Sequence, residues 1–301
     1  METLNLTKYR ASLLLTILVT IGTSSLAQAY DFDSNRFSSR RRGGSLSSFG
    51  RDEGSTQSLS IAGGIASPSS TGFFGENPTG LIFNQHASLL AYLATGKDDP
   101  SLLSNGFSFL GGNGLAAAMI GVQTYNNATD AGGSITHFNF GMATFAEAIN
   151  VAFGLSGSYR FQTGSNAVDP ALAPTWTADL GILYNPFGGF QVGAMLYGLS
   201  EGVTAAGAGI AAHINTYSLF AFDVSADRHG RGLTVKPGLG VRAGSLNLTY
   251  AYGMQVDKSA LSGITPGNTI GLGYDFTPQF RVIGYYNHFA TYYMGATIDL
   301  F

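Results

Sequence analysis

Residues 232–301 consist of five segments of about ten residues that alternate apolar and small polar side chains, and the chain ends on Phe301. Successive side chains of a β-strand point to opposite faces, so this alternation gives each strand one apolar and one polar face. In residues 245–257, for example, every even position is apolar, whereas the odd positions carry Ser, Asn, Thr, Ala, Gly, Gln and Asp. Such a series is typical of a closed barrel whose outer face meets lipid and whose inner face meets water. We therefore expect an all-β fold, a transmembrane antiparallel β-barrel.

The composition agrees with a membrane barrel. Charged residues make up 11% of the chain, against roughly 25% in an average soluble domain. Glycine accounts for 42 of the 301 residues, which suits strands that curve. The net charge of −3 argues against a nucleic-acid partner. Since the chain has no cysteine, a lipoprotein anchor, a disulfide framework and a thiolate metal site are excluded.

The N-terminus has the three parts of a secretory signal peptide. Lys8 and Arg10 supply the positive charge, residues 11–22 form the apolar run, and Ala27-Gln28-Ala29 is a small-residue cleavage site. The apolar run is too short for a membrane anchor, which needs roughly 20 residues to span a bilayer. We expect a signal peptide over residues 1–29 and export to the outer membrane of a Gram-negative bacterium.

Two further segments precede the barrel. Residues 30–57 are rich in Ser, Gly and Arg and have no apolar period that could build a core, which predicts a flexible periplasmic tail. The basic run Arg40-Arg41-Arg42 within it could be part of a solvated linker, or could contact anionic lipid or another protein. Residues 58–81 are more apolar and glycine-rich, which indicates a packed, irregular segment. The barrel itself is expected over residues 82–301.

Counting strands backward from the C-terminus gives fourteen, an even number, as single-chain bacterial barrels require. The connections between them alternate in length, and outer-membrane barrels have short periplasmic turns and longer extracellular loops. If residues 205–217 were a loop instead of a hairpin, the short and long sides would exchange partway along, so the hairpin is preferred. The predicted strands are 82–94, 104–110, 114–126, 134–145, 148–162, 175–185, 189–200, 205–213, 216–226, 232–243, 245–257, 267–277, 279–289 and 291–301.

The last predicted strand has one irregularity. Its apolar row consists of Met294, Ala296, Ile298 and Leu300, so Phe301 is out of phase with its own lipid-facing row. A bulge or a frayed last residue would reconcile the two.

Three motifs resemble a known family. Residues 75–81 (Gly-Glu-Asn-Pro-Thr-Gly-Leu) resemble the Asn-Pro-Ala-Gly-Leu signature that precedes the first strand of FadL-type hydrophobic-compound transporters and their PorV-like relatives, with Thr79 in place of alanine. Residues 177–186 and 240–244 are similar to two strand motifs of the same family. The family is known for a fourteen-stranded barrel with an N-terminal hatch.

The resemblance implies that residues 58–81 form a plug inside the barrel, with a hatch turn at Asn77, Pro78 and Gly80. The turn is physically reasonable because Pro78 lacks an N–H and holds Asn77 in an extended conformation. The alternative is that Asn-Pro is simply a turn before a strand.

Alternation also assigns polar residues to the lumen. A Lys or Arg that faces lipid at the bilayer midplane costs roughly 2–4 kcal/mol, so such residues belong inside the barrel or near its rims. We expect them to form internal ion pairs and hydrogen bonds that hold the plug, with substrate binding as the alternative. The lumen-facing candidates are His137, Asn139, Arg160, Asp179, Lys236 and Arg242.

No catalytic or metal-binding constellation stands out. The serines have no convergent His and Asp, and the five histidines show no paired metal-ligand spacing. We expect a non-enzymatic barrel, without cofactor or metal, that binds or passes small hydrophobic molecules across the outer membrane by diffusion. Its partners would be outer-membrane lipid and a hydrophobic small molecule. The alternatives are a PorV-like scaffold for proteins of a secretion or surface-attachment system and, third, a general porin.

Overall fold

The computed structural model of the chain describes eleven stretches of residues. Within them, no helix has both the length and the apolar character needed to cross a membrane. The described residues are 64–68, 77–84, 86–96, 103–126, 134–163, 175–187, 189–215, 217–257, 267–277, 279–287 and 291–300.

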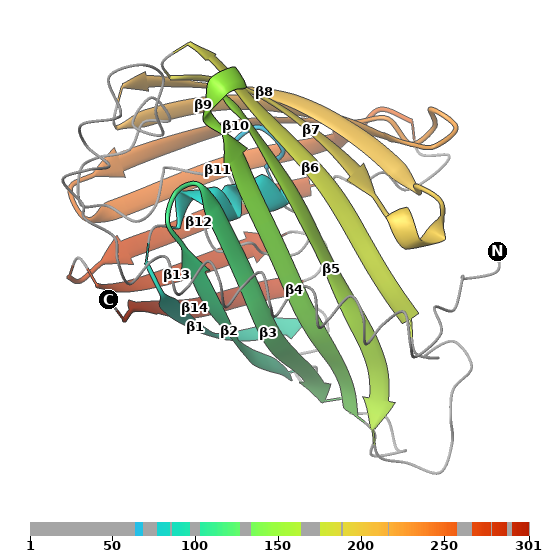
Figure 1. Cartoon of the computed structure of the whole chain (residues 1–301), viewed down its shortest axis with the longest axis vertical. Helices are drawn as coiled ribbons and strands as arrows, with labels where there is room; N and C mark the ends of the chain where they lie inside the picture. Colours follow the sequence, from blue (N-terminus) through green and yellow to red (C-terminus); the bar gives the residue numbers. More distant parts are fainter. Residues whose placement is uncertain are drawn as a thin grey trace.

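Fourteen antiparallel strands form a closed barrel, in which each strand pairs with its neighbours along the chain (Figure 1). The first and last strands close the ring, with Ser88 opposite Asp299 and Gly96 opposite Thr291. The predicted fold class and the predicted number of strands are therefore confirmed. The strands are β1 (Ser88–Gly96), β2 (Leu103–Gly112), β3 (Ala116–Asn126), β4 (Ser134–Ala146), β5 (Val151–Thr163), β6 (Thr175–Phe187), β7 (Phe190–Tyr197), β8 (Ala205–Asn215), β9 (Ser218–Asp227), β10 (Thr234–Ala243), β11 (Leu246–Gln255), β12 (Gly267–Asp275), β13 (Phe280–Asn287) and β14 (Thr291–Asp299).

The outer face of the barrel is apolar, as the alternation predicts. In β11 the side chains of Leu248, Tyr250 and Tyr252 are 43–47% exposed, whereas Thr249 and Ala251 between them are buried. Exposed apolar side chains recur at alternate positions around the ring, for example Ile270, Leu272 and Tyr274 on β12 and Phe220 and Phe222 on β9. In water such a surface would be unfavourable, and in a bilayer it is the face that lipid covers.

The connections are short at one end of the barrel and mostly longer at the other. Two to four residues separate the strands at the short-turn end, where the β10–β11 turn contains Gly244 with a φ of +59°. At the long-loop end up to eleven residues separate β5 from β6 and β11 from β12, and only the β13–β14 connection is short. This confirms the predicted alternation of connection lengths.

The prediction that the first strand begins at residue 82 is wrong. β1 begins at Ser88, and residues Pro78–Phe83 form a 3-10 helix, η3, which packs against β2 to β6 and is drawn in cyan in Figure 1. Asn77 caps this helix with its side chain, and Pro78 supplies the φ of the first helical turn. Leu81, Ile82 and Phe83 are at most 1% exposed, so all sides of the helix are covered instead of one face only.

Two other predicted strand ends differ from the structure by three residues each, and the remaining ends by two residues or fewer. β5 begins at Val151, after the short helix η4 (Glu147–Ile149), because Asn150 adopts a left-handed conformation with a φ of +55°. β7 ends at Tyr197, where Gly198 has a φ of +65° and begins the turn into η6 (Leu199–Glu201). Positive φ values interrupt a strand, which accounts for both shifts.

The C-terminal strand has the predicted outward row. Met294 and Ile298 are 59% and 44% exposed, whereas Thr297 between them is buried. The backbone N–H of Leu300 donates to the carbonyl of Ala87 at 2.7 Å, which extends the closing ladder past the last strand residue. Phe301, whose phase is irregular in the sequence, lies outside the described residues.

Replacing Leu272 by arginine tests which face meets lipid. Leu272 is 48% exposed near the middle of β12, so Leu272→Arg should lower the free energy of unfolding by about 2–4 kcal/mol. The measurement is urea unfolding of the barrel in lipid vesicles. Leu272→Met, which keeps the site apolar, should change it by less than about 1.5 kcal/mol. Equal stabilities of the two variants would contradict the lipid-facing assignment.

Candidate functional site: the interior of the barrel

The candidate site is the inner face of β4 to β9 and the chain that lies against it. We call residues 64–68 and 77–84 together the inner segment. In it Gly64 and Asn77 are joined by a hydrogen bond of 3.3 Å between the Asn77 N–H and the Gly64 carbonyl. The described residues of the inner segment are buried throughout.

A row of glycines on the inner wall makes room for the inner segment. A Cβ added at any of them would lie under 3.0 Å from an atom of the inner segment. At Gly154 and Gly193 that atom belongs to the backbone, so only glycine lets the two backbones approach this closely, whereas at the other glycines it belongs to a side chain. Gly154 of β5 and Gly181 of β6 are directly opposite each other in the sheet. The row consists of Gly141 facing Leu81, Gly154 facing Thr79, Gly181 facing Asn77, and Gly193 and Gly207 facing Ile65.

Asn77 connects the two halves of the inner segment to the wall. Its side-chain N–H groups donate to the carbonyl of Ile65 at 2.8 Å and to the carbonyl of Ile182 in β6 at 3.1 Å. Its side-chain oxygen accepts from the backbone N–H of Thr79 at 3.2 Å and from the Thr79 hydroxyl at 2.8 Å. The side chain is fully buried, and these bonds satisfy both ends of the amide.

Asp223 of β9 holds the other half of the inner segment. Its carboxylate accepts from the backbone N–H of Ile65 at 3.0 Å and of Ala66 at 3.2 Å. Lys236 of β10 lies directly opposite Asp223 in the sheet, and both residues are at most 4% exposed. A buried charge is unfavourable unless it is paired and hydrogen-bonded, and this carboxylate has two amide donors and a cation next to it.

The predicted hatch residues all belong to the inner segment. Asn77 precedes η3 with φ −61° and ψ 116°, which is the extended conformation that a following proline favours. Pro78 is the first helical residue, and the N–H of Gly80 donates to the carbonyl of Asn77 at 3.0 Å. Thr79, which departs from the family motif, contributes its hydroxyl to the Asn77 side chain.

Three of the predicted lumen residues lie together on β4 and β5, on the same face as Gly141 and Gly154. His137 is directly opposite Arg160, and Asn139 is directly opposite Ser158. Asn139 is 1% exposed, and neither end of its amide has a hydrogen-bond partner in the part of the chain that the structure describes.

The other three predicted lumen residues lie apart from this group. Asp179 of β6 accepts from the backbone N–H of Gly198 at 2.9 Å and so supports the β7–β8 connection. Lys236 of β10 lies directly opposite Asp223 of β9 in the sheet. Arg242 lies at the short-turn end, where its guanidinium is 3.8 Å from the Asp275 carboxylate.

The sequence reasoning missed Asp223, Asp275 and Arg281. Asp275 accepts from the Arg281 Nε on the opposite strand and also pairs with Arg242, so one carboxylate bridges two cations. Asp223 could have been found, because it is in the inward phase between the outward Phe222 and Val224. Its contact with Ile65 could not be found from alternation, which gives the face of a residue but not its partner.

The described residues contain no group of three or more His, Cys, Asp or Glu side chains that could hold a metal ion. The interior polar groups bind backbone amides, backbone carbonyls and one another. These hydrogen bonds and ion pairs hold a segment of the chain inside the closed barrel.

Comparison with known proteins gives a likeness in fold. No family model and no curated protein matches the chain. The Pseudomonas putida toluene transporter TodX is similar with a TM-score of 0.50 and 11% identity over 81% of this chain and 98% of TodX. The CymD monoaromatic hydrocarbon channel gives a TM-score of 0.50 and 12% identity over 74% of this chain and 91% of CymD. The shared feature is the fold.

A further similar structure is the Acinetobacter baumannii outer membrane protein Omp33. Its TM-score is 0.48 and its identity 9%, over 72% of this chain and 98% of Omp33. The FadL-like resemblance of the three sequence motifs remains a prediction, since the likeness to TodX and CymD concerns the fold alone.

Replacing Gly181 by alanine tests the glycine row. The new Cβ would overlap the Asn77 side chain, so the free energy of unfolding should fall by about 1–3 kcal/mol, as for other overpacked sites. Gly273→Ala is the matched control, because its Cβ would be 3.5 Å or more from its neighbours on the inner face of β12. Urea unfolding in vesicles measures both variants, and an equal effect at the two sites would contradict a close contact at Gly181.

Proposed function

We propose that the protein is an outer-membrane barrel of a Gram-negative bacterium that passes small hydrophobic molecules across the membrane by diffusion, without catalysis or cofactor. The observation that carries the proposal is the apolar inner segment held against the wall of a closed, lipid-facing barrel. In a wide aqueous pore, water would fill the volume that the buried apolar side chains of this segment occupy. The side chains that pack between this segment and the wall exclude water from that part of the interior, which argues against passage of large hydrated solutes.

The fold neighbours suggest which compounds to test first. TodX is described as a toluene transporter and CymD as a monoaromatic hydrocarbon channel. Since the likeness extends to the fold alone, toluene is a starting substrate for this chain and not an assigned one.

Uptake into vesicles tests the proposal directly. The purified protein is reconstituted in lipid vesicles that enclose a toluene-oxidising enzyme, and the product formed from radiolabelled toluene measures toluene entry. In parallel, swelling of the vesicles in a solution of a small sugar measures sugar entry. We expect more product than in vesicles that contain the enzyme but no barrel, and little swelling of the vesicles in the sugar solution. Rapid sugar swelling would favour a general porin. No gain in either measurement, together with co-purification of a secretion-system protein, would favour a scaffold.

We further propose that residues 58–81, whose described part belongs to the inner segment, act as a plug, with Asn77, Pro78 and Gly80 as its hatch turn and His137, Asn139, Arg160, Asp179, Lys236 and Arg242 lining the lumen around it. The support is that Asn77 and Asp223 bind the segment to two parts of the wall, β6 and β9, which are three strands apart in the ring. A segment held against the inner wall in this way would narrow the path through the barrel.

Removing the carboxylate of Asp223 should loosen the plug. Asp223→Ala removes the acceptor of the Ile65 and Ala66 N–H groups, so residues 64–68 should detach more readily and the conductance of the barrel in planar bilayers should rise above that of wild type. Asp299→Asn is the control, because it removes one wall carboxylate whose described side-chain bond is to Ser88 of β1 and not to the inner segment. Unchanged conductance in a folded Asp223→Ala barrel would contradict the plug.

A further inference from the structure

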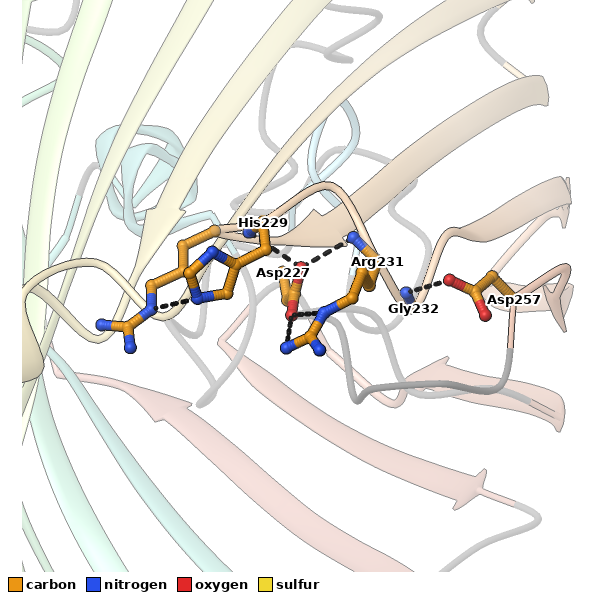
Figure 2. A network of polar contacts seen from close by, with 6 residues as sticks. Asp227, His229, Arg231, Gly232 and Asp257 are labelled. Atoms are coloured by element: carbon orange, nitrogen blue, oxygen red, sulfur yellow. Dashed lines mark hydrogen bonds and ion pairs between the residues drawn. The ribbon is translucent and has the colours of Figure 1, made fainter. Parts of the chain in front are cut away.

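The connection between β9 and β10, residues 228–233, lies at the long-loop end of the barrel, and we call it the rim loop. Its three basic residues, Arg228, His229 and Arg231, are all exposed. The polar network around Asp227 that shapes this loop is shown in Figure 2.

The rim loop is held in one conformation by carboxylates at both of its ends. The Asp227 carboxylate accepts from the backbone N–H groups of His229 at 2.9 Å and Arg231 at 2.7 Å, and it also pairs with the Arg231 guanidinium at 3.2 Å (Figure 2). At the far end the Gly232 N–H donates to the Asp257 carboxylate at 3.0 Å. These bonds restrict the loop before any partner binds, which lowers the entropy cost of binding.

Arg228 continues the lipid-facing row of β9. Its backbone N–H donates to the Thr204 carbonyl at 3.0 Å, one step beyond the last β8–β9 pair, Ala205 and Asp227. Arg228 is the first residue after β9 and lies in the turn in which the Gly230 N–H donates to the Asp227 carbonyl at 2.9 Å. Counted along the chain, Arg228 falls in the phase of the exposed Phe220 and Phe222, and it is itself exposed. An exposed cation directly beyond the end of a lipid-facing row is at the level where lipid headgroups begin.

The charge of Arg228 is not neutralised within the described part of the chain. The neighbouring carboxylate, that of Asp227, pairs with Arg231 instead. The Arg228 Nε donates to the Nε2 of His229 at 3.0 Å, which orients the guanidinium and leaves its two terminal NH2 groups for another acceptor. A guanidinium with both terminal groups available matches the oxygens of a phosphate bidentately.

We propose that Arg228, oriented by His229, binds a phosphate group of a membrane lipid in the leaflet at the long-loop end. Lipid-bound phosphate is favoured over free phosphate because Arg228 is in line with the lipid-facing row. The site rests on the proposed residence of the barrel in a membrane, but not on which compound the barrel transports. Its role would be to fix the depth and orientation of the rim at the leaflet surface.

Lipid titration of the full-length protein tests this site. Native mass spectrometry in mixed micelles measures binding of lipid A, of lipid A without its phosphates, and of inorganic phosphate. Wild type should bind lipid A about tenfold more tightly than Arg228→Gln, as expected for the loss of a charge-assisted pair of hydrogen bonds. Arg228→Lys, which keeps the charge but not the fork, should give an intermediate affinity.

Three results would overturn the site: equal affinity of wild type and Arg228→Gln for lipid A, equal affinity of wild type for the two lipids, or binding of inorganic phosphate as tight as that of lipid A. Heat-modifiable migration on a gel shows that each variant is folded. Toluene uptake by Arg228→Gln should equal that of wild type. The uptake assay therefore tests the proposed transport, and the lipid titration tests this site separately.

Discussion

In a hydrocarbon layer each backbone N–H and C=O needs a partner within the protein, because no water is present to supply one. A sheet satisfies this requirement only when its edges are joined, which β1 and β14 achieve over nine residue pairs. The bond from the Leu300 N–H to the Ala87 carbonyl adds one more step. Closure fixes the phase of all strands at once, since a shift by one residue would turn a whole apolar row inward. The position of each interior group depends on that phase.

Closure also places a requirement on any segment that lies inside the barrel, and the glycine row helps to meet it. A chain segment inside the barrel leaves its own backbone groups away from bulk water, and they too need partners. The Asp223 carboxylate accepts from the Ile65 and Ala66 N–H groups, and the Asn77 side chain donates both to the Ile65 carbonyl and to the wall carbonyl of Ile182. These bonds require close approach, and glycines at the contact points permit it. The glycine content of the sequence thus has a second cause besides strand curvature.

Alternation predicted the barrel well because lipid imposes a strict period of two on each strand. It was wrong at residues 82–87, since Ile82 and Phe83 are apolar whether they face lipid or pack inside, and a run of apolar residues has no period. The Asn77-Pro78 pair, a helix cap followed by a first-turn proline, was the available signal. Alternation also placed Lys236 and Arg242 on the inner face without naming their partners. Asp275 reaches Arg242 from β12, two strands away, and that distance depends on the register of two hairpins.

The two halves of the inner segment are held by different interactions. Leu81, Ile82 and Phe83 pack into the main apolar cluster with residues of β1 to β6, and burial of each such side chain contributes roughly 1.5–3 kcal/mol. Residues 64–68 bury one large apolar side chain, Ile65, and otherwise depend on bonds to Asp223 and Asn77. A net hydrogen bond contributes roughly 0.5–1.5 kcal/mol, or about twice that when one partner is charged. The two halves thus differ in what holds them, so loss of the Asp223 carboxylate would weaken the hold on residues 64–68 and leave the packing of η3 intact.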